Sequence, residues 1–285
     1  MSPVLPFEII ALIIDIVGEN EDKNLLKELA LVSHYFLQIC SKHLFATVEL
    51  HDAVPKRDIA SSKKGFVKLL KGSPDVVKYI RKLTYQVGLC DNNEDHLPIL
   101  PVLLRTISRL NCLTIFGYYM DWNTLDSSLA SALLHLMHLP TINHIDLSYI
   151  CNFPLSILTP SVNLLRLDIL TCSVTPEENG SSEIVVQSEM TPKIRELYTS
   201  SSSQLTMKLL HAKRPDGRPA FNFMDLRRLS MSFNDSEDDR YIRHLLQNAK
   251  LLEKLHLSVL YGRSLVGLLS LSARTVKSLH LSVSL

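Results

Sequence analysis

The feature that most constrains this chain of 285 residues is a leucine-spaced pattern that recurs from residue 80 to its end. The pattern is LxxLxL, with other aliphatic residues allowed at the marked positions, and its central residues lie 20 to 32 positions apart. Alternating apolar positions of this kind predict a strand with one buried face. The eight copies, of which the fifth is the weakest, are Ile80-Leu83-Tyr85, Leu110-Leu113-Ile115, Ile142-Ile145-Leu147, Val162-Leu165-Leu167, Ile194-Leu197-Thr199, Leu226-Leu229-Met231, Leu252-Leu255-Leu257 and Val276-Leu279-Leu281.

Helical patterns separate several of these strands, because aliphatic residues fall near positions i, i+3 and i+4. A unit of one strand, one loop and one helix cannot bury its apolar face alone, so neighbouring units must stack. The sequence therefore predicts an α/β fold, an irregular solenoid with a parallel sheet on its concave face. The predicted helices are Pro98–Leu110, Asp126–Leu139, Asp239–Leu251 and Ser264–Ala273.

This part of the chain, residues 75–285, resembles the divergent leucine-rich repeats that often follow an F-box. Only the copy that begins at Leu226 completes the family pattern with an asparagine, Asn234, so the other loops must be held differently. Chance matches in a leucine-rich chain are the alternative, and the spacing and the intervening helices argue against it. No polar capping unit follows the last strand, so we expect an exposed edge, from truncation at the C-terminus or because another chain covers it.

The first fifty residues differ, because their apolar residues predict three short helices. Pro6 suits a first helical position, and Ser33 is a plausible N-cap for a third helical piece over His34–Phe45. The first helix is apolar around most of its circumference, and a module of fifty residues cannot easily cover all of it. One stripe, read as buried, is Ile9, Leu12, Ile13 and Ile16, and a second stripe on another side is Ile10, Ile14 and Val17.

The order of these residues resembles the F-box over roughly Leu5 to Leu50. The resemblance rests on Leu5-Pro6-x-Glu8-Ile9, on Leu29-Ala30-Leu31-Val32-Ser33-His34-Tyr35-Phe36 and on Leu44-Phe45. It implies a module that packs against a Skp-type adaptor and thereby joins a cullin-based ubiquitin ligase. By motif position the adaptor-facing residues would be Leu5, Pro6, Ile9, Leu31, Val32 and Ser33, with Phe36 where many members have tryptophan.

The surplus apolar surface of the first helix adds Ile10 and Ile14 to this predicted adaptor-binding set. Leaving such side chains in water would forgo roughly 1.5 to 3 kcal/mol each, which burial against a partner recovers. The alternative is that all these residues form the core of a small helical cap on the repeats.

Composition argues against most other classes of function. Thirty basic and 29 acidic residues give a net charge of +1, so no global field favours nucleic acid or membrane. The five cysteines contain no CxxC pair and are read as buried thiols in a reducing compartment. Gly262 to Gly267 lacks the residues of a phosphate-binding loop, and His135 with His138 lacks a third metal ligand. We expect no enzyme, no cofactor and no metal.

The amino-terminal apolar run carries Glu8 and Asp15 and follows no basic segment, so a signal peptide is not expected. The two uncharged stretches of nineteen residues, Ser127 to Ile145 and Leu147 to Leu165, contain too many polar residues and prolines to span a bilayer. These features predict a cytoplasmic or nuclear protein.

Charge is nevertheless uneven along the chain. The segment Lys56 to Lys82 carries nine basic and two acidic residues, so residues 51–74 are read as a basic linker between the helical module (1–50) and the repeats. A solvated helix face explains it more readily than contact with RNA or an acidic partner. The segments Thr175–Pro192 and Ser200–Ser203 are read as surface insertions.

These expectations combine into a substrate receptor of a Skp-cullin-F-box ubiquitin ligase, with the helices docking the adaptor and the repeats binding a protein substrate. Two alternatives stay open. One is a repeat scaffold that binds proteins without a ubiquitin role, and the other is a nucleic-acid-binding repeat protein.

Overall fold

The computed structural model describes residues 6–20, 22–51, 63–88, 99–174, 190–233, 238–260 and 276–284. Several predictions fall outside these ranges. They concern Leu5, Cys90, most of Thr175–Pro192, Asn234, Gly262 to Gly267 and the helix predicted over Ser264–Ala273.

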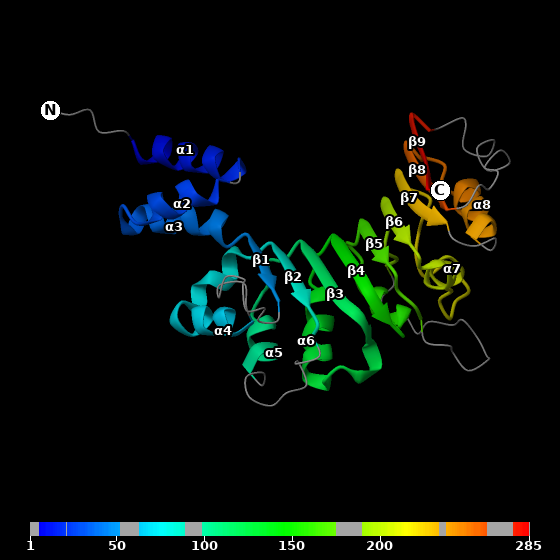
Figure 1. Cartoon of the computed structure of the whole chain (residues 1–285), viewed down its shortest axis with the longest axis horizontal. Helices are drawn as coiled ribbons and strands as arrows, with labels where there is room; N and C mark the ends of the chain where they lie inside the picture. The colour runs from blue at the N-terminus through cyan, green and yellow to red at the C-terminus, as the bar shows by residue number, and fades with distance from the viewer. Residues whose placement is uncertain are drawn as a thin grey trace.

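The repeats form one sheet of nine parallel strands whose spatial order is the order of the chain. Figure 1 shows the strands side by side along the inner face of a curved array, which confirms the predicted α/β solenoid. The strands are β1 (Thr47–Leu50), β2 (Lys82–Gln86), β3 (Cys112–Asp121), β4 (His144–Cys151), β5 (Arg166–Leu170), β6 (Glu196–Ser200), β7 (Arg228–Phe233), β8 (Lys254–Leu260) and β9 (Ser278–Ser284).

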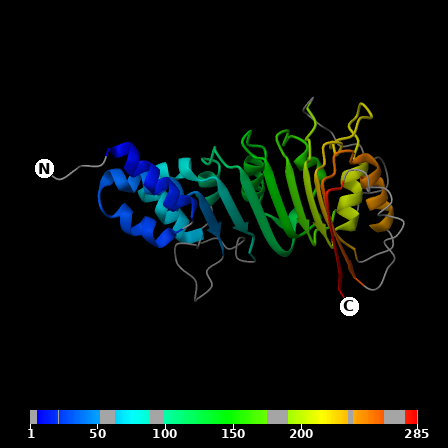
Figure 2. The same ribbon diagram turned by 90° about the horizontal axis from the view of Figure 1, so that it is seen from above.

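Helices cover the convex face of this sheet, as Figures 1 and 2 show. They are α4 (Lys63–Gly72), α5 (Ile99–Leu104), α6 (Ser127–Met137), α7 (Ser203–His211) and α8 (Asp238–Asn248), with short 3-10 turns at Pro74–Tyr79, Trp122–Thr124 and Leu155–Leu158. The predicted helices over Asp126–Leu139 and Asp239–Leu251 correspond to α6 and α8, whereas the one over Pro98–Leu110 is shorter than expected. Asp126 starts α6 by accepting hydrogen bonds from the Ser128 and Leu129 amides.

The pairing register stacks the central aliphatic residues of the copies from β2 to β8 into one core behind the sheet, whereas Leu279 in β9 is 47% exposed. Leu113 pairs with Leu83 on one side and with Ile145 on the other, and all three are buried. The fourth copy is two residues later than predicted, because Leu167 and not Leu165 pairs with Ile145. The buried triplet there is Leu164-Leu167-Ile169, and Leu165 is only partly buried.

A repeated backbone contact joins successive units at the start of each strand. The Asn111 carbonyl accepts hydrogen bonds from the amides of Asn143 and His144, and the Asn143 carbonyl accepts from Leu165 and Arg166. The same pair of bonds recurs from the Ala46 carbonyl to the Glu253 carbonyl. Main-chain groups, which are present whatever the side chain, therefore hold these irregular units together.

The amino-terminal helices α1 (Phe7–Glu19), α2 (Lys23–Ala30) and α3 (His34–Leu44) pack around a small core of their own. Ile14, Leu26 and Cys40 are its fully buried members. Helices α1 and α3 are also joined by polar contacts, since Asp15 lies 2.6 Å from the Lys42 ammonium and 2.8 Å from the His43 ring. Ser33 accepts a hydrogen bond from the Phe36 amide, which confirms its prediction as the N-cap of α3.

The boundaries between these parts differ from the sequence prediction. Strand β1 lies inside the first fifty residues and pairs with β2, so Phe45-x-x-Val48-x-Leu50 is a further copy of the repeat pattern. Residues 63–72 of the predicted linker form α4, whose Phe66 and Leu70 are buried in the main core. These two apolar positions anchor the helix to the sheet, and the basic residues lie between them and on either side.

The prediction of a surface insertion at Ser200–Ser203 is wrong for Ser202, which is buried. Its hydroxyl accepts a hydrogen bond from the Cys172 amide and donates one to the Ser200 carbonyl. Ser200 itself belongs to β6. The Ser202 hydroxyl therefore ties the connection from β6 to α7 to the backbone at the ends of two strands.

Candidate functional site

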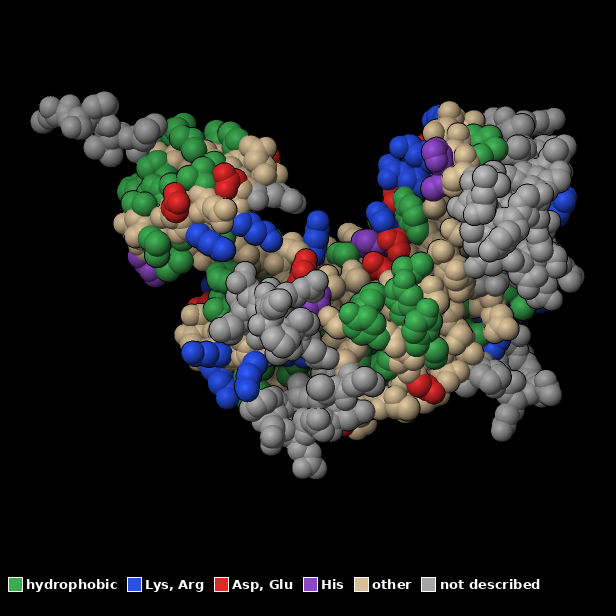
Figure 3. Space-filling model, in the orientation of Figure 1, with side chains coloured by type: hydrophobic (Ala, Val, Ile, Leu, Met, Phe, Trp, Pro, Cys, Tyr) green, Lys and Arg blue, Asp and Glu red, His purple; other side chains and the backbone are tan. Residues whose placement is uncertain are grey.

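The helical module presents a broad apolar surface to solvent, and its members come from all three helices and the turn between α2 and α3. We call it the helical apolar surface, and Figure 3 shows hydrophobic side chains over much of this end of the molecule. Soluble proteins seldom expose so many neighbouring aliphatic and aromatic side chains without a partner. Its exposed members are Phe7, Ile9, Leu12, Ile13, Ile16, Leu25, Leu31, Val32 and Leu37.

The two stripes of α1 have the opposite roles to those the sequence suggested. The stripe predicted to be buried faces solvent, and its member Leu12 is 57% exposed. This stripe is Ile9, Leu12, Ile13 and Ile16. Ile14 of the other stripe is 1% exposed, and Ile10 and Val17 pack against the same core. Helical spacing shows that two stripes exist, but only the positions of α2 and α3 decide which one is covered.

The predicted adaptor-facing residues fall into two groups. Pro6, Ile9, Leu31, Val32 and Ser33 are exposed, with Leu31 at 87% and Val32 at 65%. Leu31 and Val32 lie in the two-residue turn that follows α2, where no other part of the module can cover them.

The second group of predicted residues faces inward. Ile10 and Phe36 are half-buried against the module core, and Ile14 lies inside it, so Ile14 is out of reach for a partner. Phe7 was missed by the sequence reading. Its ring packs against the tilted ring of Tyr35 with 4.8 Å between centroids, and the Tyr35 hydroxyl donates a hydrogen bond to the Phe7 carbonyl.

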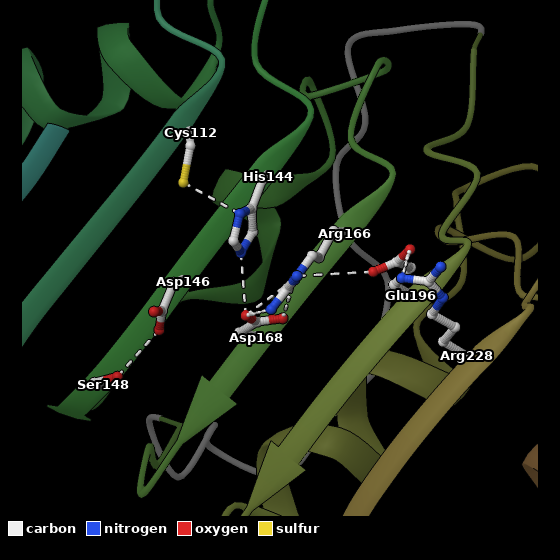
Figure 4. A network of polar contacts seen from close by, with 8 residues as sticks. All are labelled: Cys112, His144, Asp146, Ser148, Arg166, Asp168, Glu196 and Arg228. Carbon is white, nitrogen blue, oxygen red and sulfur yellow. Dashed lines mark hydrogen bonds and ion pairs between the residues drawn. The ribbon is translucent and has the colours of Figure 1, made fainter. Parts of the chain in front are cut away.

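A polar network crosses the concave face of the sheet from β3 to β7, as Figure 4 shows. The Cys112 thiol lies 3.1 Å from Nδ1 of His144, and Nε2 of His144 lies 3.1 Å from Asp168. Arg166 meets the same carboxylate at 2.8 Å. These polar residues occupy x positions of the LxxLxL pattern. Polar residues at those positions are the sequence signal for the concave face.

The network continues toward the carboxyl end through Glu196, which lies 3.8 Å from Arg166 and 3.1 Å from Arg228. Arg166 also stacks over the Tyr198 ring at 4.5 Å. Each cation therefore alternates with an anion along neighbouring strands, and this part of the network is largely satisfied within the chain.

Burial and pairing shift the ionisation of this network. Burial lowers the pKa of His144, but its hydrogen bonds with Asp168 and Cys112 outweigh this and raise that pKa to about 9. For Asp168, burial raises the pKa, yet the bonds from His144 and Arg166 bring it below the usual value. The neighbouring Asp146 has a raised pKa, because it is buried and faces the Asp168 charge.

His138 and the buried cysteines have structural roles. His138 donates a hydrogen bond to the Ile157 carbonyl, as the reading of ordinary histidines implies. No cluster of three metal-ligating side chains occurs in the described ranges. Cys40 and Cys172 are buried as expected, and burial raises the pKa of Cys172 to about 11, whereas Cys112 and Cys151 are half-buried.

The described part of the basic segment lies mainly on α4 and the following turn. The Lys63 ammonium is buried and lies 4.8 Å from the Tyr85 ring centroid, and Lys78 pairs with Asp75 at 3.3 Å. Two of its cations are thus engaged with the chain itself.

Among the helices of the described ranges, none is long and apolar enough to cross a membrane.

The fold and these surfaces define a class of protein, an α/β repeat solenoid with a helical module at its amino end. Comparison with known proteins adds no narrower assignment, because no family model and no curated protein matches the chain.

Proposed function

We propose that this chain is the substrate receptor of a Skp-cullin-F-box ubiquitin ligase. The observation that carries the proposal is the helical apolar surface, since a folded module that leaves Leu31 and Val32 in water is suited to a protein partner. The order of residues around it resembles the F-box, which supplies the identity of the partner. The adaptor would bind α1 to α3, and through it a cullin.

The mechanism is proximity. The sheet would hold a protein substrate while the helices hold the adaptor, so a substrate lysine is kept at high local concentration near a charged conjugating enzyme. The chain itself contributes no catalytic group. An adaptor interface of ordinary size would cover about 800 Å² of this chain.

Replacement of exposed apolar residues by aspartate tests the proposal. We expect Leu31→Asp combined with Val32→Asp to abolish capture of a Skp-type adaptor by the full chain in a pull-down with purified proteins. Each buried aliphatic side chain contributes roughly 1.5 to 3 kcal/mol, so losing two of them and burying two charges would weaken binding beyond detection. Ile10 and Ile14 are unsuitable targets, because they support the module core.

A matched control comes from the repeat half. Val102 on α5 is 57% exposed and Leu251 is 48% exposed, so Val102→Asp combined with Leu251→Asp makes the same chemical change elsewhere. This control should capture adaptor as the parent chain does. Equal capture by the Leu31 and Val32 variant would overturn the proposal, and failure of the parent chain to capture any adaptor would favour the scaffold alternative.

A further inference from the structure

An irregularity in the sheet marks a second surface. Strand β3 carries three residues, Gly117 to Tyr119, opposite the single Tyr149 of β4. A Cβ atom at Gly117 would lie 3.1 Å from the Tyr149 carbonyl oxygen, so the glycine permits this close approach. Bulges of this kind redirect side chains and occur often beside functional sites.

Three tyrosines at the bulge adopt the left-handed backbone region. Their φ angles are 26° for Tyr118, 60° for Tyr119 and 57° for Tyr149. Each such residue costs on the order of 1 kcal/mol or more, since a bulky side chain crowds the following carbonyl. A chain under no other demand would be expected to place glycine or asparagine here.

The strained backbone holds four rings in a row, Tyr118, Phe116, Tyr149 and Tyr119, which we call the aromatic row. Successive centroids are 4.7, 5.2 and 5.3 Å apart, and the contacts are edge-to-face. The end members are 66% and 65% exposed, so the row offers ring faces to solvent. Figure 3 shows a hydrophobic patch in the middle of the molecule, bordered by acidic side chains toward the hollow of the array.

A carboxylate lies next to this row. Phe116 pairs in the sheet with Ser148, whose hydroxyl donates to Asp146. Burial raises the pKa of Asp146, and so does the nearby Asp168. Asp168 forms ion pairs with both His144 and Arg166. These two cations also lower the pKa of Asp146, but less than burial and Asp168 raise it, and in the described ranges neither forms an ion pair with Asp146. An external cation would relieve the cost of this half-buried charge.

On the other side of the row, polar contacts lead through two residues to a second carboxylate on β1. Phe116 also pairs with Gln86, whose side chain lies 2.8 Å from His51, and His51 lies 3.2 Å from the exposed Glu49. Ring faces attract cations, and the carboxylate of Asp146 attracts them by its charge. The two features together favour a positively charged group over a neutral or acidic one.

We propose that the aromatic row, with Asp146 beside it, binds a lysine or arginine side chain of a protein partner. The inference rests on the proposed function, because it names the substrate chemistry of the sheet in a substrate receptor. It predicts a substrate segment with a basic residue that lies against the tyrosine rings.

Selection from a random heptapeptide library displayed on phage tests this inference on the full chain. Among bound peptides we expect lysine or arginine to be enriched about fivefold or more at one position relative to the unselected library. Tyr118→Ala combined with Tyr119→Ala should abolish the enrichment. Asp146→Asn, which keeps the side-chain shape, should reduce it, and Tyr118→Phe combined with Tyr119→Phe should preserve it because the ring faces remain.

Tyr79→Ala provides the matched control, since it removes a tyrosine far along the chain from the bulge and should leave the selection unchanged. Absence of basic enrichment, or enrichment that survives Tyr118→Ala with Tyr119→Ala, would overturn the inference. Adaptor capture by the same preparations keeps the two proposals apart. Adaptor capture reports only on the helical module, which has a core of its own, so an unchanged thermal unfolding transition of the repeats shows that the alanine variant keeps a folded sheet.

Discussion

At the scale of single residues, the concave face carries some charged side chains that form ion pairs and another, Asp146, that forms none with a described residue. His144 is held between Cys112 and Asp168, while Asp146, on the same strand, has only Ser148 as its hydrogen-bond partner among the described contacts. Two carboxylates on neighbouring strands therefore differ in the direction of their pKa shift. The difference arises from their partners, since both are half-buried.

The raised pKa of His144 predicts a pH-dependent contribution to stability. The folded value is about 9 and the unfolded value is about 6.5, so the contribution is complete below about pH 6.5 and is lost as pH rises through about 9. We expect the parent chain to exceed His144→Gln by on the order of 1 to 3 kcal/mol in free energy of unfolding at pH 6.

Urea unfolding at pH 6, 7.5 and 9.5 measures this difference. It should shrink steadily over the series, because the neutral imidazole no longer attracts Asp168. A difference that stays constant from pH 6 to pH 9.5 would show that the charge of His144 does not matter to stability.

At the scale of elements, the sequence predicts the existence of the strands better than their register. Val162-Leu165-Leu167 and Leu164-Leu167-Ile169 both fit the leucine pattern, because Leu164 and Leu165 are adjacent. Pairing with β4 decides between them by placing Leu167 beside Ile145. The sequence does not show which of the two leucines pairs with Ile145 of the neighbouring strand.

Alanine substitution tests this register. Leu167→Ala should lower the free energy of unfolding by about 3 kcal/mol, because it opens a cavity in a fully buried position. Leu165→Ala should cost less, since Leu165 is only partly buried and its backbone contacts to Arg195 and Glu196 are kept. The reverse order of the two urea midpoints would contradict the observed pairing.

The packing of α1 on α3 depends on a small residue. A Cβ atom at Gly18 would overlap the His43 ring, which in turn contacts Asp15. Alanine normally stabilises a helix relative to glycine by roughly 1 kcal/mol. Here we expect Gly18→Ala to destabilise the module instead, seen as lower protection of α1 amides in hydrogen exchange.

Gly72→Ala is the corresponding control, because a Cβ atom there meets no neighbour within 4 Å and Gly72 ends a helix of the same chain. Its effect on α1 should be absent. Unchanged protection in Gly18→Ala would mean that His43 moves aside at little cost.

At the scale of the whole molecule, the solenoid followed from the recurrence of one pattern, whereas the candidate sites followed only in part. The surplus of apolar residues on α1 was visible in the sequence, yet the face that remains exposed depends on α2 and α3. The aromatic row was not foreseen, because Phe116 and Tyr149 meet only through a bulge between strands about thirty residues apart. Local periodicity carries no signal for such a contact.

The joint between the helices and the sheet has a geometric consequence. Only Phe45 and Ala46 separate α3 from β1, and Leu44 packs in one core while Phe45 packs against the other. The connection is therefore short and anchored on both sides, so under the proposed function an adaptor bound to the helices would keep a fixed orientation relative to a substrate on the strands. Neighbouring strands lie about 4.8 Å apart, so adding or deleting one repeat unit would shift the substrate relative to the adaptor by a fixed distance without changing either binding surface.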